Sequence, residues 1–464
     1  MIHRISGITL FAALSVLCLV QTVQSQDTLR VNLQDFIRTG IENSGQVAYE
    51  SRAVDLAGNR VSSTRSQRFL PRVEFSSQHG VIPGVVSQRD DLSSGQYYLD
   101  PDLSNDWEDW AIFTRAEFNA IQPVYSWGAI NSAVSAAESG ARAAEHQFSA
   151  VKAEAELQLF ELYFSYLLAE EISRIIEDAS DQIDQVERTI NRMRDEGDPD
   201  LKESDVFKFE ILKSEFQVQR AEVRESLNFV KRVWNYALRA TGNNVYRPTE
   251  SFLDPIAFEI ESYEYYEHLA MQSRPELRGV ESGIDALKNS VEAVKAQQYP
   301  LLFLGITGSY ANTPNRPRQT NPFIINSTNY ASAGIGFGIR QNLNFSSMRN
   351  NVERTEIEFK RVQDLHRAVS DGITLELNEK YRDAVLAEVR MKQTEAALST
   401  ARNWVRNEQL NYDIGFGDIE DLLESLQTEL ELRLKLKQNV FDLNKTIAAL
   451  YKASGVPINQ LHLN

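Results

Sequence analysis

Acidic side chains follow a glycine turn near the C-terminal end of the chain. Asp421 and Glu424 come shortly after Gly415 and are three residues apart, so on a helix they share one face. In an oligomer with an axial pore, such a pair from every subunit would form stacked carboxylate rings, which pass cations and hold back anions. Acid at a helix N-terminus also complements the helix dipole, which alone explains Asp418 and Glu420. Both interpretations stay open for Asp421 and Glu424.

The remaining residues show no pattern typical of catalysis. The chain has no phosphate-binding glycine loop, no nucleophile elbow and no Cys/His pair. Its six histidines are scattered without the paired spacing of metal ligands; they are His3, His79, His146, His268, His366 and His462. We therefore expect no enzyme, no cofactor and no metal site.

A duplicated pattern dominates the sequence. Gln122 begins a long helical stretch, and Gln341 begins another 219 residues later. The interval from each glutamine to the next turn glycine, Gly197 or Gly415, is 75 residues in the first copy and 74 in the second. Internal repeats indicate architecture more strongly than local patterns do. The predicted divisions are a signal peptide 1–25, a first repeat 26–242 (strand pair about 72–121, helical hairpin about 126–242), a connector 243–262, a second repeat 263–455 (strand pair about 301–340, hairpin about 345–455) and a tail 456–464.

The composition is that of a largely water-exposed protein. Mean hydropathy is −0.37 and 24 % of residues are charged. An apolar stretch at 8–20, followed by small residues before Gln26, predicts a secretory signal peptide. The only cysteine, Cys18, lies inside it, so we expect no thiol or disulfide in the mature protein. A net charge of −17 argues against nucleic acid as a partner.

The strand pairs alternate between apolar and polar residues. In the second pair, alanine, isoleucine and phenylalanine at 331, 333, 335, 337 and 339 alternate with serine, glycine and arginine. Lengths of about ten residues, and Trp107 and Trp110 beside the first pair, fit membrane strands better than a soluble hairpin. A sheet in lipid must close, because an open edge leaves backbone groups unpaired. Four strands cannot close, so the membrane interpretation requires an oligomer.

The helical stretches are unusually long. Residues 126–192 contain no proline, and a helix of that length would extend for on the order of 100 Å, so it must pack along its length against other helices. A single helix is expected over about 33–65. The last helix spaces Leu436, Val440, Leu443, Ile447 and Leu450 by four, three, four and three residues, the pattern of a coiled-coil seam.

At these residues the chain resembles the TolC family of outer-membrane efflux proteins. The resemblance rests on the duplicated unit, on Gln122-Pro123-Val124-Tyr125-Ser126-Trp127-Gly128, and on Tyr412-Asp413-Ile414-Gly415 followed by Asp421 and Glu424. It implies a mainly α fold with membrane β structure. In it, a trimeric 12-stranded β-barrel is continuous with a long α-helical coiled-coil barrel, and the connector and chain end form an equatorial belt.

The family also implies roles for individual residues. Asp421 and Glu424 match the acidic pair at the pore constriction, and Tyr412 and Glu203 match a tyrosine–carboxylate latch. Gly417 stands where a well-known member has an arginine, which predicts a differently built latch. The expected hairpin turns and adaptor-docking residues are Gly197, Leu201, Ser204, Gly415, Gly417, Ile419 and Leu422.

The resemblance implies an export channel gated at its periplasmic tip, in the outer membrane of a Gram-negative bacterium. Expected partners are two further copies of the chain, a periplasmic adaptor, outer-membrane lipid, and an inner-membrane pump of RND, ABC or MFS type, as in tripartite efflux or type I secretion. Nucleic acid is not expected. The alternative is a periplasmic or surface-attached coiled-coil scaffold without channel activity, which would not need two strand pairs with one apolar face.

Overall fold

The computed structural model describes residues 28–69, 71–93, 96, 99–197, 201–240, 245–318, 321, 323–324, 326–414 and 417–458. The predicted signal peptide, Cys18, Gly415 and most of the predicted tail lie outside this part. The chain forms two compact units. The hairpin unit comprises Met1–Ala48, Val151–Gln272 and Leu375–Asn464, and the sheet unit comprises Tyr49–Ala150 and Ser273–Thr374. Each unit takes segments from both sequence repeats, and the fold is mainly helical, as predicted.

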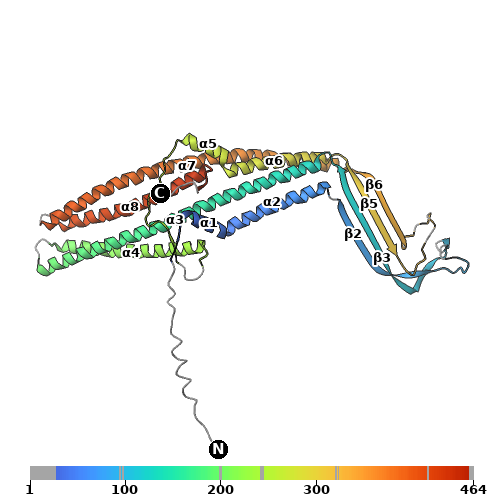
Figure 1. Cartoon of the computed structure of the whole chain (residues 1–464), viewed down its shortest axis with the longest axis horizontal. Helices are drawn as coiled ribbons and strands as arrows, with labels where there is room; N and C mark the ends of the chain where they lie inside the picture. Colours follow the sequence, from blue (N-terminus) through green and yellow to red (C-terminus); the bar gives the residue numbers. More distant parts are fainter. Residues whose placement is uncertain are drawn as a thin grey trace, which may run out of the picture. The chain divides into compact units, whose positions relative to one another are not determined.

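The sheet unit is built on four antiparallel strands. They are β2 (Arg72–Val86), β3 (Ser104–Tyr125), β5 (Leu301–Asn312) and β6 (Tyr330–Arg340), in the order β2-β3-β5-β6 (Figure 1). The register aligns Val73, Ala120, Ile306 and Ile335 in one row across the sheet. Strands from the two repeats therefore pair directly, through β3 and β5.

The two faces of this sheet differ in character, as the alternation predicts. Phe75, Ile335 and Phe337 belong to the apolar face and are exposed, Phe337 to 84 %. On the other face of β6, Gly338 lies under the ring of Phe303, whose nearest atom is 2.5 Å from where a Cβ would stand. A side chain at this position would require the Phe303 ring to move. The sheet is a single layer with one apolar and one polar face.

Aromatic side chains lie near both ends of the apolar face. At one end Trp127 contacts Tyr299 and Tyr125, with ring centroids 5.2 and 5.1 Å apart, and its indole N–H donates to the Pro300 carbonyl. Toward the other end Trp107 and Trp110 lie 5.9 Å apart. Aromatic residues at both edges of an apolar band are typical of membrane strands.

Two helices complete the described sheet unit together with parts of the long helices. They are α2 (Gly45–Phe69), which begins in the hairpin unit, and α6 (Pro275–Ala296). The predicted single helix over 33–65 is wrong, because α1 (Leu33–Asn43) ends at Ser44, whose extended backbone separates it from α2. No helix among the described residues is both long enough and apolar enough to cross a membrane.

The hairpin unit is built from helices that double back on themselves. The first hairpin is α3 (Ala129–Glu196) with α4 (Glu203–Ala237), and the second is α7 (Phe345–Asp413) with α8 (Ile419–Ala453). Helix α5 (Tyr263–Ser273) also belongs here. The core surrounds Trp234, which stacks on Phe36 at 4.0 Å and is fully buried. The predicted α8 seam is confirmed as packing: Val440, Leu443 and Ile447 are buried in this core, and Leu450 is also fully buried.

The connector between the repeats is more ordered than its prolines suggest. Strand β4 (Val245–Pro248) pairs in parallel with β1 (Thr28–Val31), a pairing that the sequence analysis missed. Beyond it, the fully buried Asn444 accepts from the Ile256 backbone N–H at 2.9 Å and donates to the Asp254 carbonyl at 2.9 Å. These bonds satisfy buried backbone groups and hold the connector on α8.

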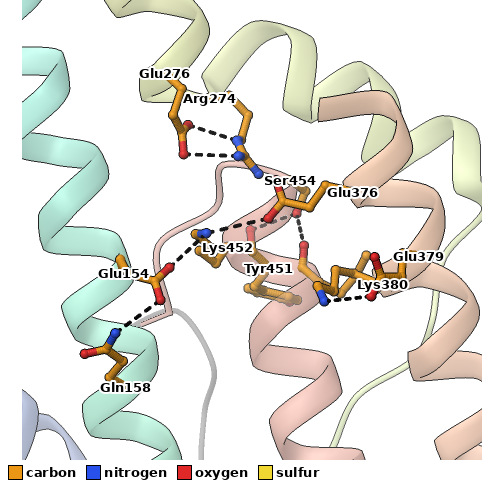
Figure 2. Close-up of polar contacts among 11 residues, drawn as sticks. Glu154, Gln158, Arg274, Glu276, Glu376, Glu379, Lys380, Tyr451, Lys452 and Ser454 are labelled. Carbon is orange, nitrogen blue, oxygen red and sulfur yellow. Dashed lines mark hydrogen bonds and ion pairs between the residues drawn. The ribbon is translucent and has the colours of Figure 1, made fainter. Parts of the chain in front are cut away.

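A lysine near the end of α8 joins the two hairpins (Figure 2). The Lys452 ammonium lies 3.0 Å from Glu154 of α3 and 3.6 Å from Glu376 of α7. The lysine side chain is only 17 % exposed, so water screens these pairs less than it screens surface pairs. The base of α8 is therefore bound to both neighbouring long helices.

Candidate functional site

The hairpin tips, where α3 turns into α4 and α7 into α8, contain most of the residues singled out from the sequence. An apolar cluster joins the two tips within the hairpin unit. Its buried members are Ile190, Val206, Phe209, Ile419 and Leu423. Burying such side chains stabilises a structure by roughly 1.5–3 kcal/mol each, so this small core fixes the tips to one another.

Two ion pairs join α4 to α8 around this cluster. Lys202 lies 2.8 Å from Asp418, and Lys208 pairs with Glu420. Asp418 also caps α8 by accepting the Glu420 backbone N–H at 3.1 Å. The hydrogen bond from Lys202, and next the bond from that N–H, hold the pKa of Asp418 below its usual value. The same bond raises the pKa of Lys202.

Asp421 and Glu424 differ from these neighbours. Both side chains are exposed in the first turns of α8. Within the described part of the chain neither has a hydrogen bond or ion pair, whereas Asp418 and Glu420 are paired with lysines. Asp421, like Glu420, lies in the first turn of α8, where an acidic side chain complements the helix dipole. The role of Asp421 and Glu424 at a pore constriction stays a prediction.

The tyrosine of the expected latch lies in the joint between the tips. The Tyr412 hydroxyl donates to the thioether sulfur of Met193 on α3, 3.0 Å away. Its ring packs against the apolar cluster. Glu203, the expected carboxylate partner, is the first residue of α4 and is exposed. The Tyr412–Glu203 pairing stays a prediction.

Gly417 is required by a close approach of two backbone segments. Its N–H donates to the Asn411 carbonyl at 3.0 Å. A Cβ on Gly417 would stand 2.6 Å from the backbone nitrogen of Tyr412, closer than real atoms come. An arginine could not replace this glycine without moving the backbone beside Tyr412. The departure from the family pattern thus has a physical reason in this chain.

The residues expected at the turns and in adaptor docking divide into two groups. Ile419 and Leu422 are buried inside the tips. Leu201 packs against the apolar cluster, Gly197 has the left-handed backbone that favours glycine (φ +64°), and Ser204 is exposed. A docking partner could contact the exposed Ser204 directly. It could not contact the buried Ile419 and Leu422, which would act only by supporting the residues above them.

The sequence analysis missed three tip residues: Lys202, Lys208 and Asp205. The partners of the lysines are 216 and 212 residues away in the chain, and no local pattern could relate them. Asp205 is buried to 99 % at the start of α4. The sequence analysis named its neighbour Glu203 instead, as the carboxylate of the expected latch. The only signal for Asp205 is its place in an amphipathic helix, on the same face as Phe209 and Phe216.

The described residues contain no group of three or more His, Cys, Asp or Glu that could hold a metal ion. The chemical feature of the tips is therefore their charge. Among the described residues, Asp418 and Glu420 are paired with lysines, and Asp421 and Glu424 have no ion pair.

The sheet unit has a single-layer sheet with an exposed apolar face, and the hairpin unit has long helical hairpins with charged tips. A family model described as outer membrane efflux protein matches residues 267–456. The matched segment, 190 of the 464 residues, is similar to the outer membrane efflux family, in agreement with the resemblance noted in the sequence. The description of that family places its members in the outer membrane, the location predicted for this chain.

Solved structures extend the similarity to nearly the whole chain. The outer membrane protein VceC of Vibrio cholerae is 15 % identical, with a TM-score of 0.70 over 92 % of this chain and 96 % of that one. The open state of the MtrE outer membrane channel of Neisseria gonorrhoeae is 13 % identical, with a TM-score of 0.71 over 92 % and 89 %. The CmeC outer membrane channel of Campylobacter jejuni is 13 % identical, with a TM-score of 0.70 over 91 % and 85 %. At these identities the similarity is one of fold. A search of curated proteins finds no match to the sequence.

Proposed function

We propose that three copies of this chain form an outer-membrane channel-tunnel that exports substrates from the periplasm, or directly from an inner-membrane pump, to the exterior. The observation that carries the proposal is the sheet itself. It has one exposed apolar face, and among the described residues β2 and β6 each lack a strand partner on one side. Lipid tolerates such a sheet only when its edges are closed. Three copies of four strands would make a closed barrel of twelve.

A second unpartnered surface supports association of copies through the helices. On α4 an apolar stripe is exposed on the side opposite the buried Val206, Phe209 and Phe216. The stripe consists of Phe207, Ile211, Val218, Phe229 and Tyr236. Its spacing places all five within a narrow arc of the helix. A helix with two apolar faces needs two partners, and the second one here would be another subunit.

Helix α7 offers a surface that could meet this stripe. Leu375, Leu386 and Val389 are exposed and share one side of α7. Contact between α4 of one copy and α7 of the next uses two different surfaces, and such a contact forms a ring when the rotation closes. A closed ring of three copies would cover the exposed stripe of α4 and would also pair the open edges of the sheet.

The gate of the channel is proposed at the tips. Asp421 and Glu424 from three subunits would form the carboxylate rings of the pore constriction, and their lack of partners within the subunit supports this role. Tyr412, with Glu203 in the expected latch, and the two lysine pairs would hold the tips closed. A periplasmic adaptor would dock around the turns, at Gly197, Leu201, Ser204, Gly415 and Gly417, over Ile419 and Leu422, and would link the channel to a pump.

Single-channel recording of the purified protein in a planar bilayer tests this proposal. Discrete conductance steps are expected from a closed pore. A protein that forms no steps and is washed from membranes by salt or alkali would instead be the coiled-coil scaffold.

A further inference from the structure

A pocket of about 310 Å³ opens between α4 and α8 near the tips. Its wall combines an apolar part with a charged part. Ile211, Leu212 and Leu423 supply the apolar part, and Asp205, Lys208, Glu215, Glu420 and Glu424 supply the charged part. Four carboxylates and one ammonium give the pocket a formal charge of 4 × (−1) + 1 = −3.

The carboxylate of Asp205 has an unsatisfied oxygen. Asp205 is 1 % exposed. Its Oδ1 accepts from the Ser204 hydroxyl at 3.1 Å, but its Oδ2 has no hydrogen-bond partner among the described residues. Leaving a buried polar atom unpaired costs about 1–3 kcal/mol, and more for a charged one. Such a group is normally paired, so a missing donor calls for an explanation.

The two nearby lysines do not supply that donor. Lys202 hydrogen-bonds to Asp418 at 2.8 Å, and Lys208 hydrogen-bonds to Glu420. Both ammonium groups are therefore held by carboxylates of α8. The pocket keeps its negative charge and Asp205 keeps its free oxygen.

We propose that this pocket binds a cationic nitrogen group, a guanidinium or primary ammonium, carried on a short aliphatic stem. The cation would donate a hydrogen bond to Asp205 Oδ2, and the stem would lie against Leu212 and Leu423. An ion–carboxylate hydrogen bond is among the stronger kinds. The cation could belong to a free organic molecule or to an arginine or lysine side chain of a bound protein, since the chemistry is the same.

A purely structural role for Asp205 predicts something different. Asp205 lies in the first turn of α4, where acid stabilises a helix through its dipole. If that were its only role, Asp205→Asn would lower the melting temperature and leave ligand binding unaffected. If Asp205 is an unpaired charge kept for a ligand, removing the charge leaves the melting temperature unchanged or raises it and weakens binding.

Isothermal titration calorimetry on the purified full chain in detergent separates these cases. The probes are N-butylguanidinium and its neutral counterpart N-butylurea. The variants are Asp205→Asn and a control, Glu210→Gln, which removes an exposed carboxylate of the same helix outside the pocket. We expect butylguanidinium to bind at least tenfold more weakly to Asp205→Asn than to the wild type. We expect Glu210→Gln to bind it within twofold of the wild type, and the wild type to bind butylurea at least tenfold more weakly.

Two results would overturn the proposal: equal binding of butylguanidinium to the wild type and to a folded Asp205→Asn protein, or equal binding of the charged and neutral probes. The titration needs no conduction, so its failure leaves the channel proposal untouched and the reverse also holds. A second pair of probes, N-acetyl-arginine amide and N-acetyl-citrulline amide, separates the two sources. Tighter binding of the arginine probe than of butylguanidinium assigns the pocket to a protein side chain. Weaker binding of the arginine probe assigns it to free organic cations.

Discussion

The sheet and the hairpin tips encode their properties in different ways. On β6 the alternation of Ile335, Phe337 and Ile339 with small residues repeats along the strand, so that several positions carry the same information. At the tips, single contacts such as Lys202 with Asp418 join residues far apart in the chain. The apolar face of the strand can be recognised from the sequence even when one residue departs from the pattern. An ion pair between two distant residues has no such repeated pattern.

Charge on the apolar face of the sheet should have the largest effect. Ile335→Arg would put a guanidinium where the proposed barrel faces lipid, at a cost of about 2–4 kcal/mol per subunit near the bilayer centre. We expect it to abolish assembly into vesicles, measured as the yield of membrane-inserted oligomer. Ser332→Arg, on the opposite face of the same strand, is the matched control and should assemble normally. Equal yields from the two variants would mean that this face does not meet lipid.

The sequence predicted the features that depend on period. The alternation in 331–340, the seam from Val440 to Leu450 and the hairpin turns near Gly197 all follow from spacing within one segment. The sequence could not predict contacts between residues that lie far apart in the chain. The β1–β4 pairing and the two lysine pairs join residues more than two hundred positions apart. The helix break at Ser44 was also missed, because 33–65 keeps helical spacing across it.

The candidate site also contains residues that a local pattern could indicate and residues whose setting depends on distant segments. Asp421 and Glu424 were singled out because they share a helix face and follow a turn glycine at a fixed spacing, and their role stays a prediction. The burial of Asp205 and the close approach at Gly417 depend on a second hairpin that packs beside the first. Ile419 belongs to the small core between the tips, and Leu422 is buried beside it; the docking role predicted for both residues stays a prediction.

A smaller effect is expected from filling the close contact at the second tip. Gly417→Ala would force a methyl group against the backbone of Tyr412 and should destabilise the tips by about 1–3 kcal/mol. Hydrogen exchange of the tip amides would report this as faster opening. Gly140→Ala is the control, because Gly140 lies inside α3 with no neighbour within 4 Å of an added Cβ. That change should stabilise the helix by about 0.5–1 kcal/mol. Unchanged exchange in Gly417→Ala would contradict the contact.

The smallest effect is expected from the exposed Lys202–Asp418 pair. Because the pKa of Asp418 lies below the ordinary value of 3.8, the pair contributes its full stability above that value. This stability is lost as the pH falls through the lowered pKa. The tips should therefore open more often below about pH 4 than at pH 5, as measured by the fraction of time that single channels conduct. In Asp418→Asn this pH dependence should be reduced, and a full dependence in that variant would remove Asp418 from the closing contacts.

Ion selectivity in single-channel recordings tests the central claim most directly. The recordings compare the wild type with Asp421→Asn, Glu424→Gln, and with a control of equal charge change, Glu210→Gln, Glu222→Gln, in exposed positions of α4. We predict cation-selective steps in the wild type and the control, and steps with much reduced selectivity in the tip variant. Identical permeability ratios in all three proteins would contradict the acidic constriction at the tips, and no steps in the wild type would contradict the channel.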